Sequence, residues 1–163
     1  MEIRHLTPAD DRKVISKIYE KSWKYAYKGI IPQDYLDTIP DGQWTPTLDH
    51  SQWNTLICIE NDIIVGTTSF GKSRLQQFDK WGEIISLYLL PNYMGKGYGK
   101  ALLESAITEL KMRGYNHVYL WVLEENLRAR HFYEKSGFSL TDDYLDNIIG
   151  GKSLREVRYI YCN

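Results

Sequence analysis

The stretch "LYLLPNYMGKGYGKALLESAI", Leu87 to Ile107, decides how this chain is read. An apolar run ends at a proline, the glycines at 95, 97 and 99 alternate with other residues, and a helical pattern begins at once. Glycine removes the side chain where a backbone approaches another group closely. The first turn of a helix offers unpaired N–H groups and the positive end of the helix dipole. The stretch therefore predicts a strand, a bare turn and a helix start that together bind a phosphate group, most simply a diphosphate.

The simplest alternative is that the glycines only permit a tight strand-to-helix turn. Three glycines in five residues exceed what such a turn requires, so the phosphate interpretation is favoured. The Walker phosphate loop is excluded, because Ala101 follows Lys100 where Ser or Thr is needed. The dinucleotide fingerprint fits poorly, since the pattern is G-x-G-x-G and lies in the middle of the chain. Glu124 and Glu125, after the next apolar run, keep that alternative open as ribose ligands.

The elements around this stretch predict one α/β domain over residues 1–163 with a mixed sheet. In the N-terminal half we expect a strand at 1–6, a helix from an N-cap at Thr7 to about Trp23, a short helix opening at Pro32, and a hairpin that turns at Asn61 and Asp62. The C-terminal half adds strands at 83–90, 117–123 and 155–161, and helices at 97–113 and 126–137. Because a helix joins the strands 83–90 and 117–123, we expect them to be parallel.

Composition narrows the class of protein. The chain has 163 residues, 43% of them hydrophobic and 25% charged, with a net charge of −1. No basic field favours nucleic acid, and no apolar run reaches the length of a membrane span. Cys58 and Cys162 have no partners at metal-ligand spacing, so we expect neither a metal site nor a disulfide framework. These features predict a soluble protein of the cytoplasm, with no nucleic-acid or membrane partner.

The segment "MGKGYG" resembles the coenzyme A pyrophosphate loop of the GNAT superfamily of acyl-CoA-dependent N-acyltransferases. Met94, Gly97 and Gly99 occupy the marked positions of the family pattern, and Met94 departs from it because the family prefers a polar side chain there. A second segment, "NLRARHFYEKSGF", resembles the helix that follows the next strand in these enzymes. The matching residues are Asn126, Ala129, Phe132, Tyr133, Gly137 and Phe138. Together the two segments extend the resemblance clearly over residues 57–138.

The resemblance implies a mostly antiparallel sheet with helices on both faces and a central parallel pair, whose strands 83–90 and 117–123 splay apart after Leu89. It also implies acetyl-CoA as co-substrate, no metal, and direct transfer of the acetyl group to a primary amine in a ternary complex. The amine would be a small amine or polyamine, a peptide N-terminus or a lysine. The implied cofactor-binding residues are Leu87, Tyr88, Leu89, Met94, Gly95, Lys96, Gly97, Tyr98, Gly99, Lys100 and Asn126. A bulge in the strand before the loop would free backbone N–H groups for the thioester.

Two side chains are predicted to be catalytic by the same resemblance. Tyr133 would donate a proton to the leaving thiolate, since a phenol titrates near 10 and is protonated at neutral pH. Its alternative is a core aromatic beside Phe132. Glu83 would deprotonate the amine directly or through water. Its alternatives are an exposed charge at the strand end, with an ordered water as the base.

Aromatic and acidic residues are candidates for the site that binds the acceptor amine. Trp23, Tyr27 and Tyr35 could line an amine-binding groove, and the alternative, which we favour for at least half of these aromatic residues, is packing against the sheet. The aspartates at 34, 37, 142, 143 and 146 would attract a cation, or would be solvated surface. The alternative function is a regulatory module that binds acyl-CoA without turnover, which Met94 favours slightly. A homodimer is a further option.

Overall fold

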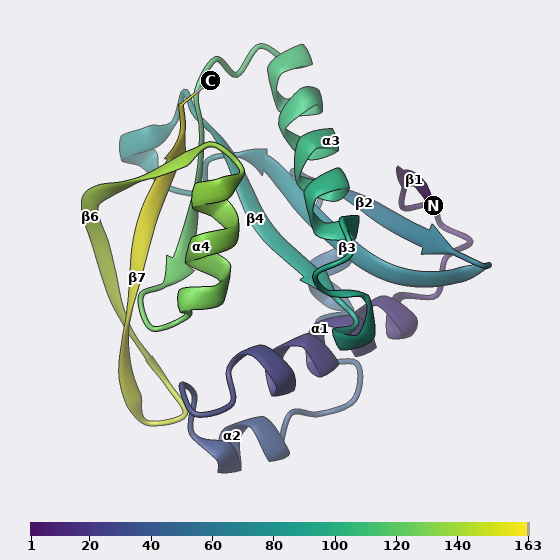
Figure 1. The fold of residues 1–163 in the computed structure, drawn as a ribbon. Helices are drawn as coiled ribbons and strands as arrows, with labels where there is room; N and C mark the ends of the chain where they lie inside the picture. The colour runs from purple at the N-terminus through teal and green to yellow at the C-terminus, as the bar shows by residue number, and fades with distance from the viewer. Residues whose placement is uncertain (163) are drawn as a thin grey trace.

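The computed structural model describes residues 1–162, and Figure 1 shows the path of the chain. Strands and α-helices alternate only in the C-terminal half, and the N-terminal half has a strand, two helices and then three successive strands. The strands are β1 (Glu2–His5), β2 (Trp53–Glu60), β3 (Ile63–Lys72), β4 (Gly82–Leu89), β5 (Val118–Leu123), β6 (Phe138–Ile149) and β7 (Lys152–Tyr161). The α-helices are α1 (Arg12–Ala26), α2 (Gln33–Asp37), α3 (Tyr98–Met112) and α4 (Leu127–Lys135). Short 3₁₀ turns are η1 (Pro46–Asp49), η2 (Gln76–Phe78) and η3 (Pro91–Tyr93).

All seven strands form one sheet in the order β1-β2-β3-β4-β5-β7-β6. Every neighbouring pair is antiparallel except β4 and β5, which are parallel and joined through α3. The predicted class, a mixed and mostly antiparallel sheet with one central parallel pair, is confirmed. The hairpin prediction is confirmed too, because Asn61 and Asp62 take left-handed φ angles of 50° and 64° between β2 and β3.

The parallel pair separates along its length. Its ladder joins Gly82 to Val118 and ends at Ile84 and Leu120, although both strands continue beyond these residues. We expected the gap to open after Leu89, and this position is wrong, because pairing stops five residues earlier at Ile84. The cause lies in β4, where the register against β3 skips Ile85. An extra residue of this kind bends a strand, and here it directs β4 away from β5.

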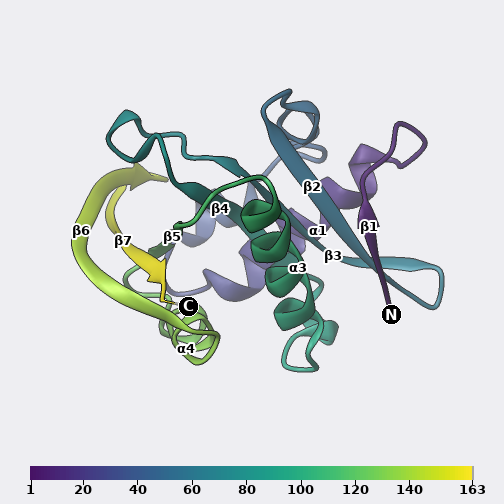
Figure 2. The ribbon, with the colours of Figure 1, turned by 90° about the horizontal axis from the view of Figure 1, so that it is seen from above.

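Helices cover both faces of the sheet, as predicted, and Figure 2 shows α3 and α1 on opposite sides. On the α3 and α4 face, a core of buried apolar side chains includes Ile84, Leu102, Leu120 and Tyr159. On the α1 and α2 face there are two smaller clusters, one around Ile15, Tyr19 and Ile57 and one around Leu36 and Leu154. The sheet is therefore the middle of three layers, and its central gap connects the two faces.

The start of α1 differs from the sequence prediction. The N-cap is Asp11, whose side chain accepts from the backbone N–H of Lys13, and not Thr7. The Asp10 carboxylate instead accepts from the backbone N–H and hydroxyl of Thr7, and the Arg4 guanidinium binds both of its oxygens at 2.9 Å. These bonds hold the residues after β1 in a turn, so the helix begins four residues later than expected. It also runs on to Ala26.

Candidate active site

The glycine-rich turn between β4 and α3 presents bare backbone. Gly95 and Gly97 have φ angles of +74° and +93°, in the left-handed region that favours glycine. A β-carbon added at either position would meet no atom within 4 Å, so both face open space. Gly97 is the cap of α3, and no side chain of the described residues caps this end. The first helical hydrogen bond runs from Ala101 N–H to the Gly97 carbonyl, which leaves the N–H groups of residues 98–100 without helix partners.

Gly99 has a different position. It is buried, and a β-carbon there would lie 3.3 Å from a Leu89 methyl and 3.6 Å from the Phe132 ring. The absence of a side chain lets α3 pack closely on β4 and α4. Any role of its backbone in binding stays a prediction, and its close packing alone is a sufficient reason for the glycine.

The side chains of the turn lie on its flanks. Lys96 Nζ is 5.9 Å from the centre of the Tyr93 ring, and that ring meets Tyr98 edge-on at 5.6 Å. Lys100 Nζ lies 3.8 Å from Glu104. Met94 is partly buried and packs against the main core. Its side chain is therefore part of the packing under the turn, where the family pattern has a polar group.

The β4 edge next to the gap supplies further backbone donors. Leu90 N–H bonds to the Val65 carbonyl, and the antiparallel ladder alternates back from there. Alternation directs the N–H of Tyr88 toward β3 and those of Leu87 and Leu89 toward the gap. The predicted bulge is present at Ile85. Of the three strand residues proposed for the thioester, Leu87 and Leu89 have free backbone in the required direction.

Two residues of the α4 segment behave differently from each other. Asn126 is the N-cap of α4, where its Oδ1 accepts from Ala129 N–H at 3.2 Å. Tyr133 lies between Phe132 and Phe138, with ring centres 5.2 and 5.8 Å away. Burial raises the pKa of Tyr133 well above its ordinary value, and Tyr88 adds to this rise. The phenol therefore holds its proton at neutral pH.

Tyrosines from both faces meet at the gap. Tyr88 packs on the α1 face beside Tyr19, with ring centres 4.6 Å apart, and its hydroxyl also lies near enough to Tyr133 on α4 to add to the rise in the pKa of that phenol. The Tyr27 and Tyr88 hydroxyls also interact, and burial raises the pKa of both phenols. In Figure 1, α1 lies below the sheet and α4 lies over the β6 and β7 side of it. The gap thus joins Tyr133 to the α1 face.

The Glu83 carboxylate is fully buried and bound on both oxygens. Arg74 N–H donates to Oε1 at 3.0 Å, and its guanidinium Nη2 donates to Oε2 at 2.6 Å. No motif or spacing in the sequence singles out Arg74. To take a proton from a substrate, this carboxylate would first have to break its ion pair with Arg74, which costs free energy. The role of Glu83 as base stays a prediction. Glu83 is not the exposed strand-end charge considered as its alternative.

The aromatic residues suggested for the acceptor pack mainly against one another. Trp23 meets Tyr27 edge-on at 5.0 Å, and Tyr35 lies 6.5 Å from the same indole ring. All three pack on the cluster around Leu36. The Trp23 Nε1 atom is buried without a hydrogen-bond partner among the described residues. Their role in binding an amine stays a prediction.

Sequence reasoning missed Glu156 on β7. It is partly buried, and burial raises its pKa above the ordinary value; Arg74 and Asn147 oppose the rise and Glu83 adds to it. A signal was present in "LREVR", where buried Leu154 and buried Arg158 flank it at alternate positions. Side chains at alternate positions share a face, so this acid points inward with them.

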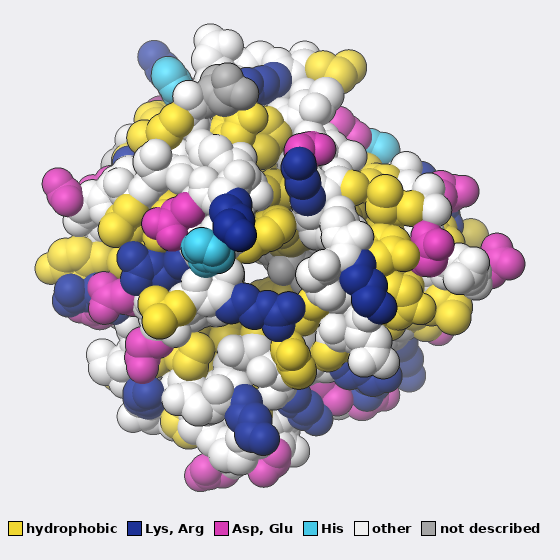
Figure 3. Space-filling view, in the orientation of Figure 1, with side chains coloured by type: hydrophobic (Ala, Val, Ile, Leu, Met, Phe, Trp, Pro, Cys, Tyr) yellow, Lys and Arg dark blue, Asp and Glu magenta, His cyan; other side chains and the backbone are white. Residues whose placement is uncertain are grey.

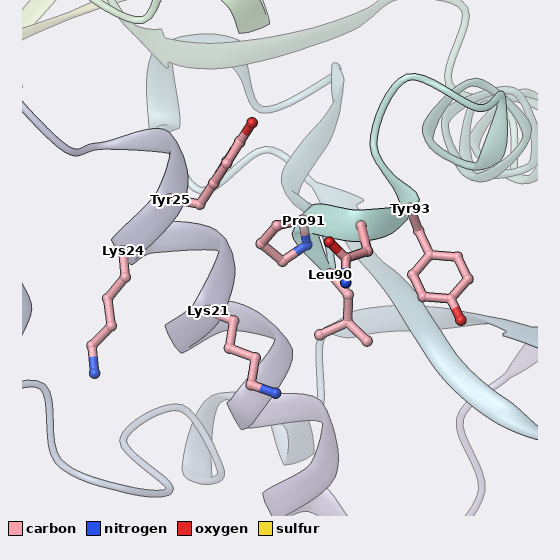
Figure 4. Close-up of a pocket in the computed structure, with 7 residues that line it drawn as sticks. Lys21, Lys24, Tyr25, Leu90, Pro91 and Tyr93 are labelled. Atoms are coloured by element: carbon pink, nitrogen blue, oxygen red, sulfur yellow. The ribbon is translucent and has the colours of Figure 1, made fainter.

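Basic residues border the outer side of the site. In Figure 3 a hollow opens on this face of the molecule with Lys and Arg side chains around it. Beside the turn, a pocket of about 450 Å³ lies between α1 and η3, and Figure 4 shows Lys21 and Lys24 across from Pro91 and Tyr93. Arg128 of α4 lies 5.6 Å above the ring of Tyr25 on α1. Within the described residues, no group of side chains is suited to hold a metal ion, and no helix is long and apolar enough to cross a membrane.

Comparison with known proteins agrees with this geometry. Residues 15–138 match the Acetyltransferase (GNAT) family, so the chain belongs to this family of acetyl-CoA-dependent acetyltransferases. It is 28% identical over 150 residues to the uncharacterized N-acetyltransferase YuaI of Bacillus subtilis, covering 91% of this chain and 86% of that protein. It is 29% identical over 147 residues to a spermidine N(1)-acetyltransferase of Thermoplasma acidophilum, covering 87% and 90%.

Solved structures show the same fold. The PaiA N-acetyltransferase of Thermoplasma acidophilum, in complex with coenzyme A, superposes with a TM-score of 0.73 at 23% identity, over 96% of this chain and 98% of that one. A ribosomal-protein-alanine N-acetyltransferase of Brucella melitensis gives 0.76 at 22% identity, over 98% of both chains. The predicted family is confirmed, and the predicted co-substrate, acetyl-CoA, is that of this enzyme class.

Proposed function

We propose that the protein transfers the acetyl group of acetyl-CoA to a primary amine by direct attack in a ternary complex. The observation that carries this proposal is the gap between β4 and β5 beyond Ile84: the glycine turn follows β4 at this end, and Tyr88 of β4 lies within electrostatic range of Tyr133. Acetyl-CoA supplies the activated thioester. The chain supplies a cradle, a proton donor and an open side for the amine.

The diphosphate is proposed to lie over residues 95–100. Gly95 and Gly97 leave this turn free of β-carbons, and the N–H groups at the start of α3 have no partners in the helix. Such groups attract anions through their partial positive charge. Lys96 and Lys100 lie on the flanks and add charge. The thioester carbonyl would then accept from the free N–H groups of Leu87 or Leu89.

Tyr133 is proposed to act at the sulfur. Its raised pKa keeps the phenol protonated, so it can donate a hydrogen bond and then a proton to the thiolate as the C–S bond breaks. The raised pKa also makes the phenol a weaker acid, so its proton moves only as negative charge develops on sulfur. Asn126 Oδ1 caps α4 and so fixes the helix that carries Tyr133, and the same side chain is proposed to bind the pantetheine arm of the cofactor.

The acceptor is proposed to be a small amine or polyamine, or else a peptide N-terminus or lysine. Relatives of both kinds support this range, one named for spermidine and one, 37% identical over 81 residues, for an alanine of ribosomal protein bS18. Asp143 and Asp146 are less available to a cationic acceptor than expected, because on strand β6 they are paired with Arg158 and Arg155.

The test is release of free thiol from acetyl-CoA in the presence of a panel of amines and N-terminal peptides, with binding of acetyl-CoA measured by calorimetry on the same protein. We expect binding without amine and thiol release with at least one class of acceptor. Binding without release for any acceptor would favour the regulatory module instead, which the packing of Met94 in the core favours slightly. Absence of binding would contradict both functions.

A further inference from the structure

Glu156 lies on the acceptor side of the sheet. On β7 it alternates with Leu154, which packs in the cluster around Leu36, and with Arg158, whose guanidinium carbon is 3.9 Å above the Phe78 ring. Its neighbours Val157 and Tyr159 belong to the core under α3 and α4. The Glu156 side chain therefore points to the α1 and α2 face, opposite the face that carries α4.

Its place along the sheet is beside the gap. Glu156 pairs with Leu123 at the end of β5, three residues beyond Leu120, where β5 leaves β4. Burial is the main reason that the pKa of the Tyr27 phenol is raised. The negative charge of Glu156 adds to this rise in pKa, and so does Tyr133. One tyrosine thus lies within electrostatic range of both the carboxylate and the proposed acid.

The surroundings leave Glu156 available. Asn147 of β6 donates to Oε2 at 2.9 Å, and no hydrogen bond reaches Oε1 from the described residues. Three charged or titratable groups face it from other elements: Arg74 before η2, Glu83 on β4 and Tyr27 at the C-cap of α1. Glu83 differs in having both oxygens bound by Arg74. Of Glu83 and Glu156, Glu156 is the one with an oxygen that accepts no hydrogen bond from the described residues.

We infer that the Glu156 carboxylate binds the ammonium group of the acceptor amine and acts as the base that removes one proton from it. This rests on the proposed function. The nitrogen lone pair freed in this way forms the C–N bond to the thioester carbon, and the C–S electron pair leaves with sulfur. Sulfur takes the Tyr133 proton, the second nitrogen proton returns to the Tyr133 oxygen, and the Glu156 proton goes to water. The products are an amide and a free thiol.

The inference is tested by the pH dependence of kcat/KM in Glu156→Gln, with Glu124→Gln as control. Glu124 is an exposed acid at the end of β5 and loses the same charge. Near neutral pH we expect Glu156→Gln to lose about 10²-fold or more in kcat/KM. The loss should shrink as pH rises and solution neutralises the amine. Acetyl-CoA affinity should not change, and the control should keep the wild-type profile.

A second variant covers the case in which Glu156→Gln folds poorly. Asn147→Ala removes a hydrogen bond that lowers the pKa of Glu156, so the acid limb of kcat/KM should move to higher pH. An unmoved limb, a loss equal at every pH, or a wild-type profile in Glu156→Gln would overturn the inference. A profile flattened by Glu83→Gln and not by Glu156→Gln would assign the base to Glu83. If the wild type releases no thiol with any amine, the proposed function fails first and this role fails with it.

Discussion

Arg74 and Glu83 form a two-pronged ion pair across the acceptor face, with Nη2 2.6 Å and Nε 3.1 Å from the same carboxylate oxygen. The Arg74 side chain is 45% exposed and that of Glu83 is 1% exposed. Water therefore solvates one partner and not the other. Removing the arginine leaves a buried charge, which is more costly than the pair itself is favourable.

We expect Arg74→Met to lower the free energy of unfolding by about 2 kcal/mol, below the full cost of breaking a buried pair because Arg74 is partly solvated. The double variant Arg74→Met/Glu83→Leu should recover most of this loss, since no charge is then buried. Urea denaturation of the three proteins measures both effects. An Arg74→Met protein as stable as the wild type would show that Glu83 does not depend on its partner.

Gly97→Ala should weaken acetyl-CoA binding by about tenfold or more, because the new methyl and the strained backbone displace N–H groups aimed at the diphosphate. Gly114→Ala is a matched control: its φ of +95° is close to the +93° of Gly97, and its β-carbon also meets no atom within 4 Å. Each variant should lose about 1 kcal/mol of stability from left-handed strain.

Calorimetry with acetyl-CoA and denaturation on both glycine variants separate the two effects. Only Gly97→Ala should lose affinity. Equal affinity in the two variants would remove the turn from the binding site.

Tyr133→Phe should reduce turnover by about 10²-fold, because the variant keeps the ring and loses the proton donor to sulfur. Its acetyl-CoA affinity should stay unchanged, since the contacts of the ring with Phe132 and Phe138 survive. Tyr144→Phe, on the exposed strand β6, serves as control. Full turnover in Tyr133→Phe would make this residue part of the packing and water the source of the proton.

Asp10 should make stability depend on pH in the acid range. Hydrogen bonds from Arg4 and Thr7 hold the pKa of its carboxyl well below the ordinary value. Stability from a depressed pKa is fully present above the unfolded value of about 3.9 and is lost as pH falls through the folded pKa. The difference in melting temperature between wild type and Asp10→Asn should be constant near neutral pH. It should shrink progressively as pH falls below about 4.

The matched comparison for Asp10 is Asp142→Asn, which removes an exposed carboxylate on the edge strand β6. It should change the melting temperature little at any pH. If the difference in melting temperature between wild type and Asp10→Asn does not shrink below about pH 4, Asp10 acts by its shape and not by its charge.

The sequence by itself determined the features that depend on neighbouring residues. The Asn61 and Asp62 turn, the glycine turn before α3 and the stop at Gly114 all follow from backbone angles that few residues adopt. The periodic apolar positions of α3 predicted a helix between β4 and β5, and a helix in this connection was enough to predict that the two strands are parallel. The same segments carried the resemblance to the family.

Only the tertiary structure decided where the sheet opens and which charges meet there. The gap begins at Ile84 because Ile85 is left unpaired against β3, a register that the sequence of β4 alone does not contain. Glu83 acquires Arg74 from a loop, and Glu156 comes from the far end of the chain to the same face. Hydrogen bonds and charges act through space, so the partners of a buried acid are set by the packing of strands and not by its neighbours in the chain.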